Sequence, residues 1–310
     1  MEILPAITRM INGEFFFDIV SACDAVSFLC QRSLFMSGTY YRSSRVISKN
    51  NARNYLSSNV KIPAPIEYIA SEAFQKKTKI SSVCFPDTLK NIGARTFQGC
   101  TLLKEVLLPT QVENMGSNVF SQCNSLKKVI LPQALSSIPR AAFQENRKLG
   151  CVIFPHDSQI SRIRSEAFSQ CTSLESLQLS SALTLIEDRA FYRCKNLRSV
   201  DFPEGLKRIG KEAFYFCAIE ELHLPQSLEF LDESAFFKCM NLTYVCLPTN
   251  IHYIGKWVFH GCNRMKYLEI RHDPDFIGPW IINRACTIRC YKGSKVDEYC
   301  KEFDFKVEYL

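Results

Sequence analysis

Cysteine is the residue type in this sequence with the most evident capacity for chemistry, because the chain of 310 residues holds 15 of them. Thiolates act as nucleophiles and metal ligands, and paired thiols form disulfides. Seven cysteines, called the cysteine column below, recur at a regular spacing: Cys100, Cys123, Cys171, Cys194, Cys217, Cys239 and Cys262. The odd total means that the cysteines cannot all pair within one chain.

The regular spacing argues against both disulfides and zinc in the cysteine column. If successive segments stack as strands do, neighbouring cysteines come within about 5 Å of each other, but their side chains point in parallel directions. A disulfide needs converging Cβ vectors, and structural zinc needs four converging ligands, usually from Cys-x-x-Cys pairs that this chain lacks. We therefore interpret the column as small buried apolar side chains and expect neither a metal nor a cofactor.

A second set of residues could do chemistry, and we call it the polar cluster: Asp201, His223, Cys246 and Glu269. An acid, an imidazole and a thiol at this spacing resemble a nucleophile with its base and orienting acid, and the four residues could also ligate a metal. Catalysis would further require contacts of about 2.6–3.2 Å, oxyanion donors and a pocket, which an open row of strands does not evidently supply. We predict that the protein is not an enzyme, with metal- or thiol-dependent activity at the polar cluster as an alternative.

The elements that position these residues follow from a repeated phenylalanine. It occurs at Phe74, Phe97, Phe120, Phe143, Phe168, Phe191, Phe214, Phe236 and Phe259. Seven of the eight spacings are 22 or 23 residues, and the remaining spacing of 25 indicates an insertion. An isoleucine or similar residue precedes each phenylalanine by about five positions, and a proline marks a constant phase in most units. A period of this length is typical of stacked repeat architectures.

Each repeat unit contains the pattern Leu-x-x-Val-x-Leu, the alternation of a short strand with one buried face. In one unit Val106 and Leu108 point inward, and Pro109 ends the strand because proline cannot donate to a ladder. A single unit cannot bury its apolar side alone, whereas stacked units form a continuous core. We predict an α/β repeat solenoid, a rod or shallow arc with one parallel strand per coil and short helical or 3₁₀ turns opposite.

The units resemble the BspA-like leucine-rich repeats, known from bacterial surface proteins and some parasitic protists. The similarity is plain in "IGKEAFYFCAIEELHLPQSLEFL" and "IGKWVFHGCNRMKYLEI", and it spans nine to ten coils over residues 56–273. Residues 274–310 contain a segment similar to the family's closing element, a strand, a Gly-Ser turn, a helix capped by Ser294 and a last strand. Residues 1–55 depart from the repeat and are expected to form a partly helical cap with a basic loop. The resemblance implies adhesion or partner binding.

The outward positions of the predicted strands suggest where a partner would bind. The residue between the two buried strand positions is apolar in four consecutive coils, at Cys84, Leu107, Ile130 and Ile153, which we call the apolar stripe. Further along, Tyr244 and Tyr267 stand beside the polar cluster. Contiguous apolar surface and tyrosine are typical of interfaces, so we predict a protein partner on this face. Two alternatives are that β-branched residues simply suit strands, and that residues 1–55 cover the stripe.

Charge and hydropathy narrow the other classes of partner. The net charge is +7, and residues 40–79 carry eight Lys or Arg and two Glu. This basic segment lacks alternation of basic and aromatic residues along the strands, so nucleic acid is disfavoured. No run approaches the roughly 20 apolar residues of a membrane span, and no signal peptide is recognisable. We expect a cytoplasmic protein, with a secreted or surface adhesin that binds host or matrix components as the alternative. Neither the oligomeric state nor the partner's identity follows from the sequence.

Overall fold

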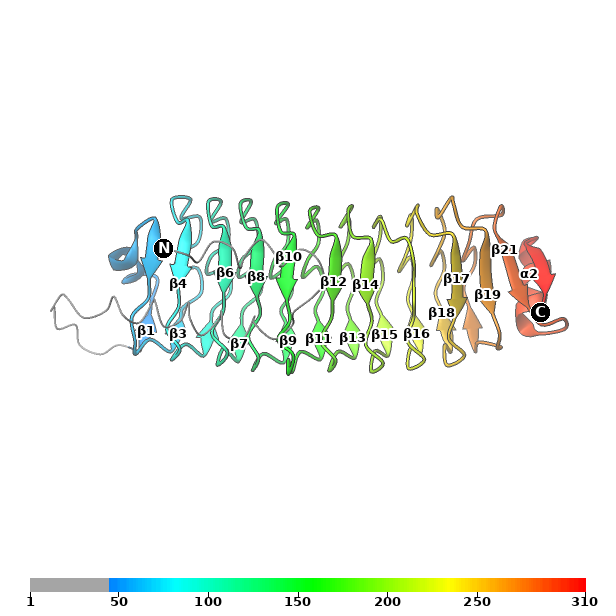
Figure 1. The fold of residues 1–310 in the computed structure, drawn as a ribbon, viewed down its shortest axis with the longest axis horizontal. Helices are drawn as coiled ribbons and strands as arrows, with labels where there is room; N and C mark the ends of the chain where they lie inside the picture. The colour runs from blue at the N-terminus through cyan, green and yellow to red at the C-terminus, as the bar shows by residue number, and fades with distance from the viewer. Residues whose placement is uncertain (1–44) are drawn as a thin grey trace, which may run out of the picture. The chain divides into compact units, whose positions relative to one another are not determined.

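A computed structural model of the chain describes residues 45–310, which form a solenoid of coils stacked side by side from β1 to β22 (Figure 1). The predicted cap of residues 1–55 therefore lies mostly outside the described residues. The repeats were expected to begin at residue 56, but the stack already includes β1. Its residues Val46 and Ile47 pair with Tyr68 and Ile69 of the next coil. Within residues 45–310, no helix combines the length and apolar character that crossing a membrane requires.

The strands predicted from the Leu-x-x-Val-x-Leu pattern form the first of two ladders, in the upper half of Figure 1. The ladder consists of β2 (Asn59–Lys61), β4 (Ser82–Cys84), β6 (Glu105–Leu107), β8 (Lys128–Ile130), β10 (Cys151–Ile153), β12 (Ser176–Gln178), β14 (Ser199–Asp201), β17 (Tyr244–Leu247), β19 (Tyr267–Ile270), β21 (Thr287–Cys290) and β22 (Lys306–Tyr309). Every pair is parallel, and hydrogen bonding divides the ladder into sheets β2-β4, β6-β8-β10, β12-β14 and β17-β19-β21-β22.

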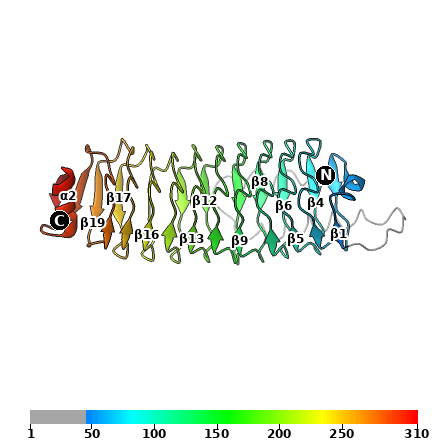
Figure 2. The same cartoon turned by 180° about the vertical axis from the view of Figure 1, so that it is seen from behind.

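A second ladder of two-residue strands runs along the lower half of Figure 1 and is seen from behind in Figure 2. It consists of β1 (Val46–Ile47), β3 (Tyr68–Ile69), β5 (Asn91–Ile92), β7 (Asn114–Met115), β9 (Ser137–Ile138), β11 (Arg162–Ile163), β13 (Leu185–Ile186), β15 (Arg208–Ile209), β16 (Phe230–Leu231), β18 (Tyr253–Ile254) and β20 (Phe276–Ile277). The prediction of one strand per coil was wrong on this point, because two residues are too few to show an alternating pattern. The solenoid of parallel strands is confirmed.

The turn that contains the buried phenylalanine is not helical, which corrects the expected helical or 3₁₀ turns. Alternate N–H groups donate within the coil to the residue three positions earlier, as Gln75 does to Glu72 at 3.1 Å. The N–H groups between them donate along the stack, as Phe74 does to Thr96 at 3.0 Å. This alternation requires left-handed backbone at two non-adjacent residues, for example Glu72 and Lys76, with φ of 64° and 56°. The turn thus keeps half of the 3₁₀ bonds and uses the rest to join coils.

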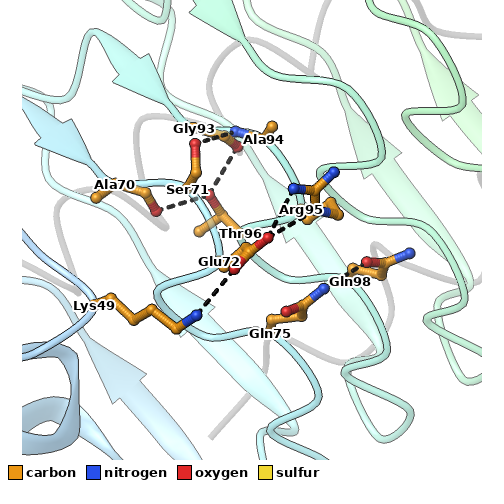
Figure 3. Close-up of polar contacts among 10 residues, drawn as sticks. All are labelled: Lys49, Ala70, Ser71, Glu72, Gln75, Gly93, Ala94, Arg95, Thr96 and Gln98. Carbon is orange, nitrogen blue, oxygen red and sulfur yellow. Dashed lines mark hydrogen bonds and ion pairs between the residues drawn. The ribbon is translucent and has the colours of Figure 1, made fainter.

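Polar side chains reinforce the same turns in the first coils (Figure 3). Glu72 lies between two cations and pairs with Lys49 at 2.9 Å and with Arg95 at 2.7 Å. The Thr96 hydroxyl donates to the Gly93 carbonyl at 2.8 Å, and it also lies 3.2 Å from the carbonyl of Ala70 one coil earlier. These contacts add side-chain links between neighbouring coils to those that the backbone makes.

The repeated phenylalanines fill the centre of the solenoid as one stacked column. All nine are at most 1 % exposed, and successive ring centroids lie 5.1–5.8 Å apart at interplanar angles of 3–11°. Offset stacking of this kind adds to the free energy that burial of the rings contributes. The aromatic period of the sequence therefore marks the core and not the binding surface.

The cysteine column lies beside the phenylalanines, buried and unpaired. Each thiol donates to the carbonyl of the phenylalanine one coil earlier, as Cys194 does to Phe168 at 3.2 Å and Cys262 to Phe236 at 3.3 Å. Burial raises the pKa of the Cys194 thiol to about 12, so it stays protonated at neutral pH. The sequence prediction of small buried residues agrees with this placement, and the donor role is an addition that the structure reveals.

The carboxyl-terminal coil ends the described solenoid with β21, a turn at Gly293, the helix α2 (Lys295–Phe303) and β22. The Ser294 side chain caps α2 by accepting from the Asp297 N–H at 3.2 Å. Asp297 in turn accepts from Gly293 N at 2.9 Å, from Lys301 at 2.9 Å and from the Tyr309 hydroxyl at 3.2 Å. Asp297 thereby joins the turn, the helix and the last strand.

Candidate functional site

The aliphatic part of the apolar stripe forms one continuous row on the first ladder. Leu107, Ile130 and Ile153 occupy the same register position in β6, β8 and β10, so each lies directly beside the next. Leu107 is 37 % exposed, and the two isoleucines are half-buried. Cys84 is also half-buried but lies on β4, which pairs with β2 in a separate sheet. The structure therefore brings together three of the four predicted residues as neighbours within one sheet.

The two tyrosines lie at the other end of the first ladder, where β17 and β19 pair Tyr244 with Tyr267. Tyr244 is 44 % exposed, and its hydroxyl donates to Glu269 at 3.0 Å. The Arg289 guanidinium lies 4.0 Å from the centre of the Tyr267 ring and pairs with Glu308 at 3.0 Å. Both tyrosines are thus held by polar partners on neighbouring strands, which limits their freedom to reorient towards a ligand.

Glu269 is the buried centre of the polar cluster. Only 4 % of the residue is exposed, and its carboxylate accepts hydrogen bonds from Arg271 and Tyr244. Burial raises the pKa of Glu269, but the hydrogen bonds from these two partners outweigh it, so the pKa lies below the usual value. Burial, followed by the bond to Glu269, raises the pKa of Tyr244 to about 12. The carboxylate is therefore an ionised structural acceptor.

Cys246 lies 3.8 Å from the Glu269 carboxylate, an environment opposite to that of a nucleophilic cysteine. Burial, with a further contribution from the negative charge of Glu269, raises the pKa of the Cys246 thiol. Reactive cysteines have a lowered pKa, because a nearby cation or helix N-terminus stabilises the thiolate. The arrangement around Cys246 favours the protonated thiol.

Asp201 and His223 stand apart from this arrangement. Both are exposed, and His223 lies 3.6 Å from Glu221. The strand that was expected to carry His223 does not form, and residues 218–225 hold no strand. The coil has one residue fewer before the strand position, with Ile219 two residues after Cys217, where Leu197 follows Cys194 by three. Within residues 45–310, no group of three or more His, Cys, Asp or Glu side chains could hold a metal ion.

Arg271 and Arg289 complete the surroundings of Glu269 and Tyr267, and neither stands among the residues predicted from the sequence. Arg271 lies just beyond β19, and Arg289 pairs in register with Glu269. Arg289 could be recognised from the sequence only by its position in the repeat, and the repeat pattern is weakest in the closing segment. Only continuing the strand frame past residue 273 would have placed it beside Glu269.

Comparison with known proteins gives a family and a fold. A family model described as the BspA type leucine rich repeat region matches residues 46–175 and 161–288. A leucine-rich repeat protein from Bacteroides ovatus superposes with a TM-score of 0.50 at 22% sequence identity, over 81% of this chain and 83% of that one. A leucine rich cell surface protein from Faecalibacterium prausnitzii superposes with a TM-score of 0.43 at 21% identity, over 82% and 88%. No curated protein matches the chain. At these identities the likeness shows the fold alone.

Proposed function

Because this chain belongs to the BspA-type leucine-rich repeat family, we propose that it is a non-catalytic binding protein whose partner is another protein held against the strand face. Repeat solenoids present extended surfaces that bind other macromolecules. Their ligands are set by the residues grafted on that surface and not by the fold. The exposed side chains of the first ladder therefore determine which kind of partner can bind.

The observation that carries the proposal is the in-register row of Leu107, Ile130 and Ile153. Adjacent strands lie about 4.8 Å apart, so the three side chains form an apolar strip roughly 10 Å long on the surface of one sheet. Glu105 and Lys128, two positions earlier on β6 and β8, border the strip with charges of both signs. An apolar centre with a charged border is the composition of a protein interface.

The alternative that these residues merely suit strands is weakened by the same column further along the ladder. The equivalent position is polar at Gln178 on β12 and at Asp201 on β14, and these strands pair just as regularly. The ladder therefore tolerates polar side chains there, and the fold does not require the aliphatic ones. The other alternative, cover by residues 1–55, concerns a segment that lies mostly outside the described residues. The proposal is that the row meets an apolar surface of a partner protein.

The proposal is tested by affinity purification from the source cell with wild-type chain and two double variants. Leu107→Glu with Ile153→Glu places two charges in the strip, whereas Gln178→Glu with Ser199→Glu places two on exposed positions of β12 and β14. Proteins captured by the wild type should be lost with the first variant and retained with the second. Circular dichroism and thermal melting check that both variants remain folded. Equal capture by all three chains would rule out the apolar strip as the interface.

A further inference from the structure

A second surface with interface character lies on the turns that follow the buried phenylalanines. Four half-buried rings on consecutive coils form what we call the aromatic column: Tyr192, Tyr215, Phe237 and His260. Their centroids lie 4.9, 5.2 and 5.7 Å apart in order, at interplanar angles of 20°, 4° and 30°. The rings stack face to face along the axis of the solenoid, so they turn their edges to solvent.

The fold does not require aromatic residues at this position. The same position holds amides or hydroxyls in the five preceding coils: Gln75, Gln98, Ser121, Gln144 and Ser169. There a hydrogen bond replaces the ring stack, as between Gln75 and Gln98 at 2.8 Å (Figure 3). The change from polar to aromatic side chains therefore alters the surface of the later coils without altering their path.

Cations accompany the aromatic column. The Arg193 guanidinium lies 5.3 Å from the centre of the Tyr192 ring, and Lys238 Nζ lies 5.5 Å from that of Phe237. Beside the column, Lys195 Nζ lies 5.7 Å from the centre of the ring of Phe216, the residue that follows Tyr215. Within residues 45–310, none of these three cations has a carboxylate within 4 Å, although many other Lys and Arg side chains of the solenoid do. Within the described part of the chain, the column thus carries positive charge that no neighbouring carboxylate neutralises.

Two tryptophans extend the surface towards the carboxyl-terminal coils. Trp257 is 39 % exposed, and both Trp257 and Trp280 have left-handed backbone, with φ of 60° and 57°. Lys256 and Arg284 lie 4.6 and 5.2 Å from the respective ring centres. The same turn position has left-handed backbone in the earlier coils, as at Glu212, so the backbone belongs to the repeat and the aromatic side chains are what distinguish these two coils.

We propose that the aromatic column and its cations form a second binding surface, for an acidic protein segment that contains aromatic or other apolar residues. Tyrosine, tryptophan and arginine are the residues most enriched at protein hot spots, and unneutralised cations select a partner of opposite charge. Ring edges are electropositive and meet carboxylates or the faces of partner rings. Nucleic acid fits less well, because bases bind to exposed ring faces and these faces are already stacked on one another.

Fluorescence anisotropy with a labelled random copolymer of glutamate and tyrosine tests this surface. The folded wild-type chain should bind the copolymer more tightly than labelled polyglutamate or oligothymidylate, and added salt should weaken the binding. The double variant Arg193→Glu with Lys238→Glu should weaken it roughly tenfold, because two attractions become repulsions. The matched control, Arg147→Glu with Lys148→Glu, reverses the same charge on exposed residues after Gln144, where the column is polar.

Three results would overturn the proposal. The first is equal loss of copolymer binding in both double variants, which would mean that only the net charge matters. The second is tighter binding of oligothymidylate that is lost in the Arg193 and Lys238 variant, which would assign the surface to nucleic acid. The third is no binding of the copolymer by the folded wild-type chain. None of these outcomes involves Leu107, Ile130 or Ile153, so this test and that of the strand face succeed or fail separately.

Discussion

Asn146 occupies the position of the cysteine column in its coil, and the exchange shows what that position must provide. Its side-chain amide donates to the Phe120 carbonyl at 2.9 Å, as each thiol of the column does to the phenylalanine of the coil before it. Its oxygen also accepts from the Cys123 N–H at 2.7 Å. From Cys100 to Cys262 the position is therefore held by small side chains that donate a hydrogen bond, which explains why cysteine recurs there without forming disulfides. In the first phenylalanine coil it is held by the exposed Lys77.

Asn146→Ala should destabilise the protein more than Cys194→Ala. The first change leaves a buried carbonyl and a buried N–H unpaired, at about 1–3 kcal/mol each. The second removes one hydrogen bond to the Phe168 carbonyl, which still accepts from the Cys171 N–H at 3.1 Å. Urea denaturation followed by circular dichroism measures both free energies of unfolding. Equal losses would mean that the thiol contributes through its volume alone and that the hydrogen bonds are incidental.

Alkylation of the native protein should separate the cysteines by exposure. Cys151 on β10 is exposed, whereas burial raises the pKa of the column thiols, that of Cys194 to about 12. Iodoacetamide at pH 8 should label Cys151 first, Cys246 slowly and the column only after denaturation. Peptide mass spectrometry gives the order. Rapid labelling of Cys246 in the folded chain would instead support the thiol-dependent alternative for the polar cluster.

The strands of the solenoid are joined by turns with left-handed residues, and the local sequence does not predict this conformation. Left-handed residues are usually glycine, yet here the two positions per coil are mostly held by other residues, such as Arg193, Glu212 and Lys238. The hydrogen bonds that their N–H groups donate to the next coil offset the steric cost. This is why the turns were predicted as helical: the signal lies in coil-to-coil bonding and not in local composition.

Gln170→Val tests the strain at one such turn. Gln170 has a φ of 62°, and a β-branched residue is strongly disfavoured there, so we expect a loss of about 1–2 kcal/mol in the free energy of unfolding. Gln170→Asn is the matched control, because asparagine tolerates left-handed backbone, and it should be nearly neutral. Thermal or urea melts of both variants decide the point. A valine variant as stable as the asparagine variant would show that the turn relaxes at no cost.

The strand pair β17 and β19 should become less stable in acid because of Glu269. The folded pKa of this carboxyl lies below its usual 4.5, so its contribution is complete above that value and is lost as the pH falls through the lower folded pKa. Glu269→Gln should therefore cost about 1–3 kcal/mol at pH 7 and less near pH 3. Melting curves at both pH values measure the difference. A cost that does not change with pH would show that the charge of Glu269 is unimportant.

At the scale of the whole solenoid, the 22–23-residue period of the sequence predicted the stacked architecture. The period did not predict very short strands or the interruption of a strand in one coil. Phe97 and Val106 mark positions that every coil repeats, so one strand ladder and the core could be derived from spacing. The second ladder, with strands such as Asn91–Ile92, is too short to leave a periodic trace. His223 was misplaced because one missing residue removes the strand on which its register was based.

The surface of the solenoid also divides along its length. The first coils carry aliphatic residues on the strand ladder and polar residues on the phenylalanine turns, and the later coils reverse this, with Asp201 on the ladder and Tyr215 on the turn. Two surfaces of different chemistry thus lie in different halves of the solenoid. Such an arrangement suits a scaffold that holds two partners at once.

The most direct test of the strand-face proposal is site-specific photocrosslinking. Benzoylphenylalanine placed at Leu107 should form a covalent adduct with one partner protein in the source cell, and the same group at Gln178, equally outward on β12, should form none. Mass spectrometry of the adduct then identifies the partner and its apolar contact. Adducts at Gln178 alone, or at neither position, would contradict recognition through the strip of Leu107, Ile130 and Ile153.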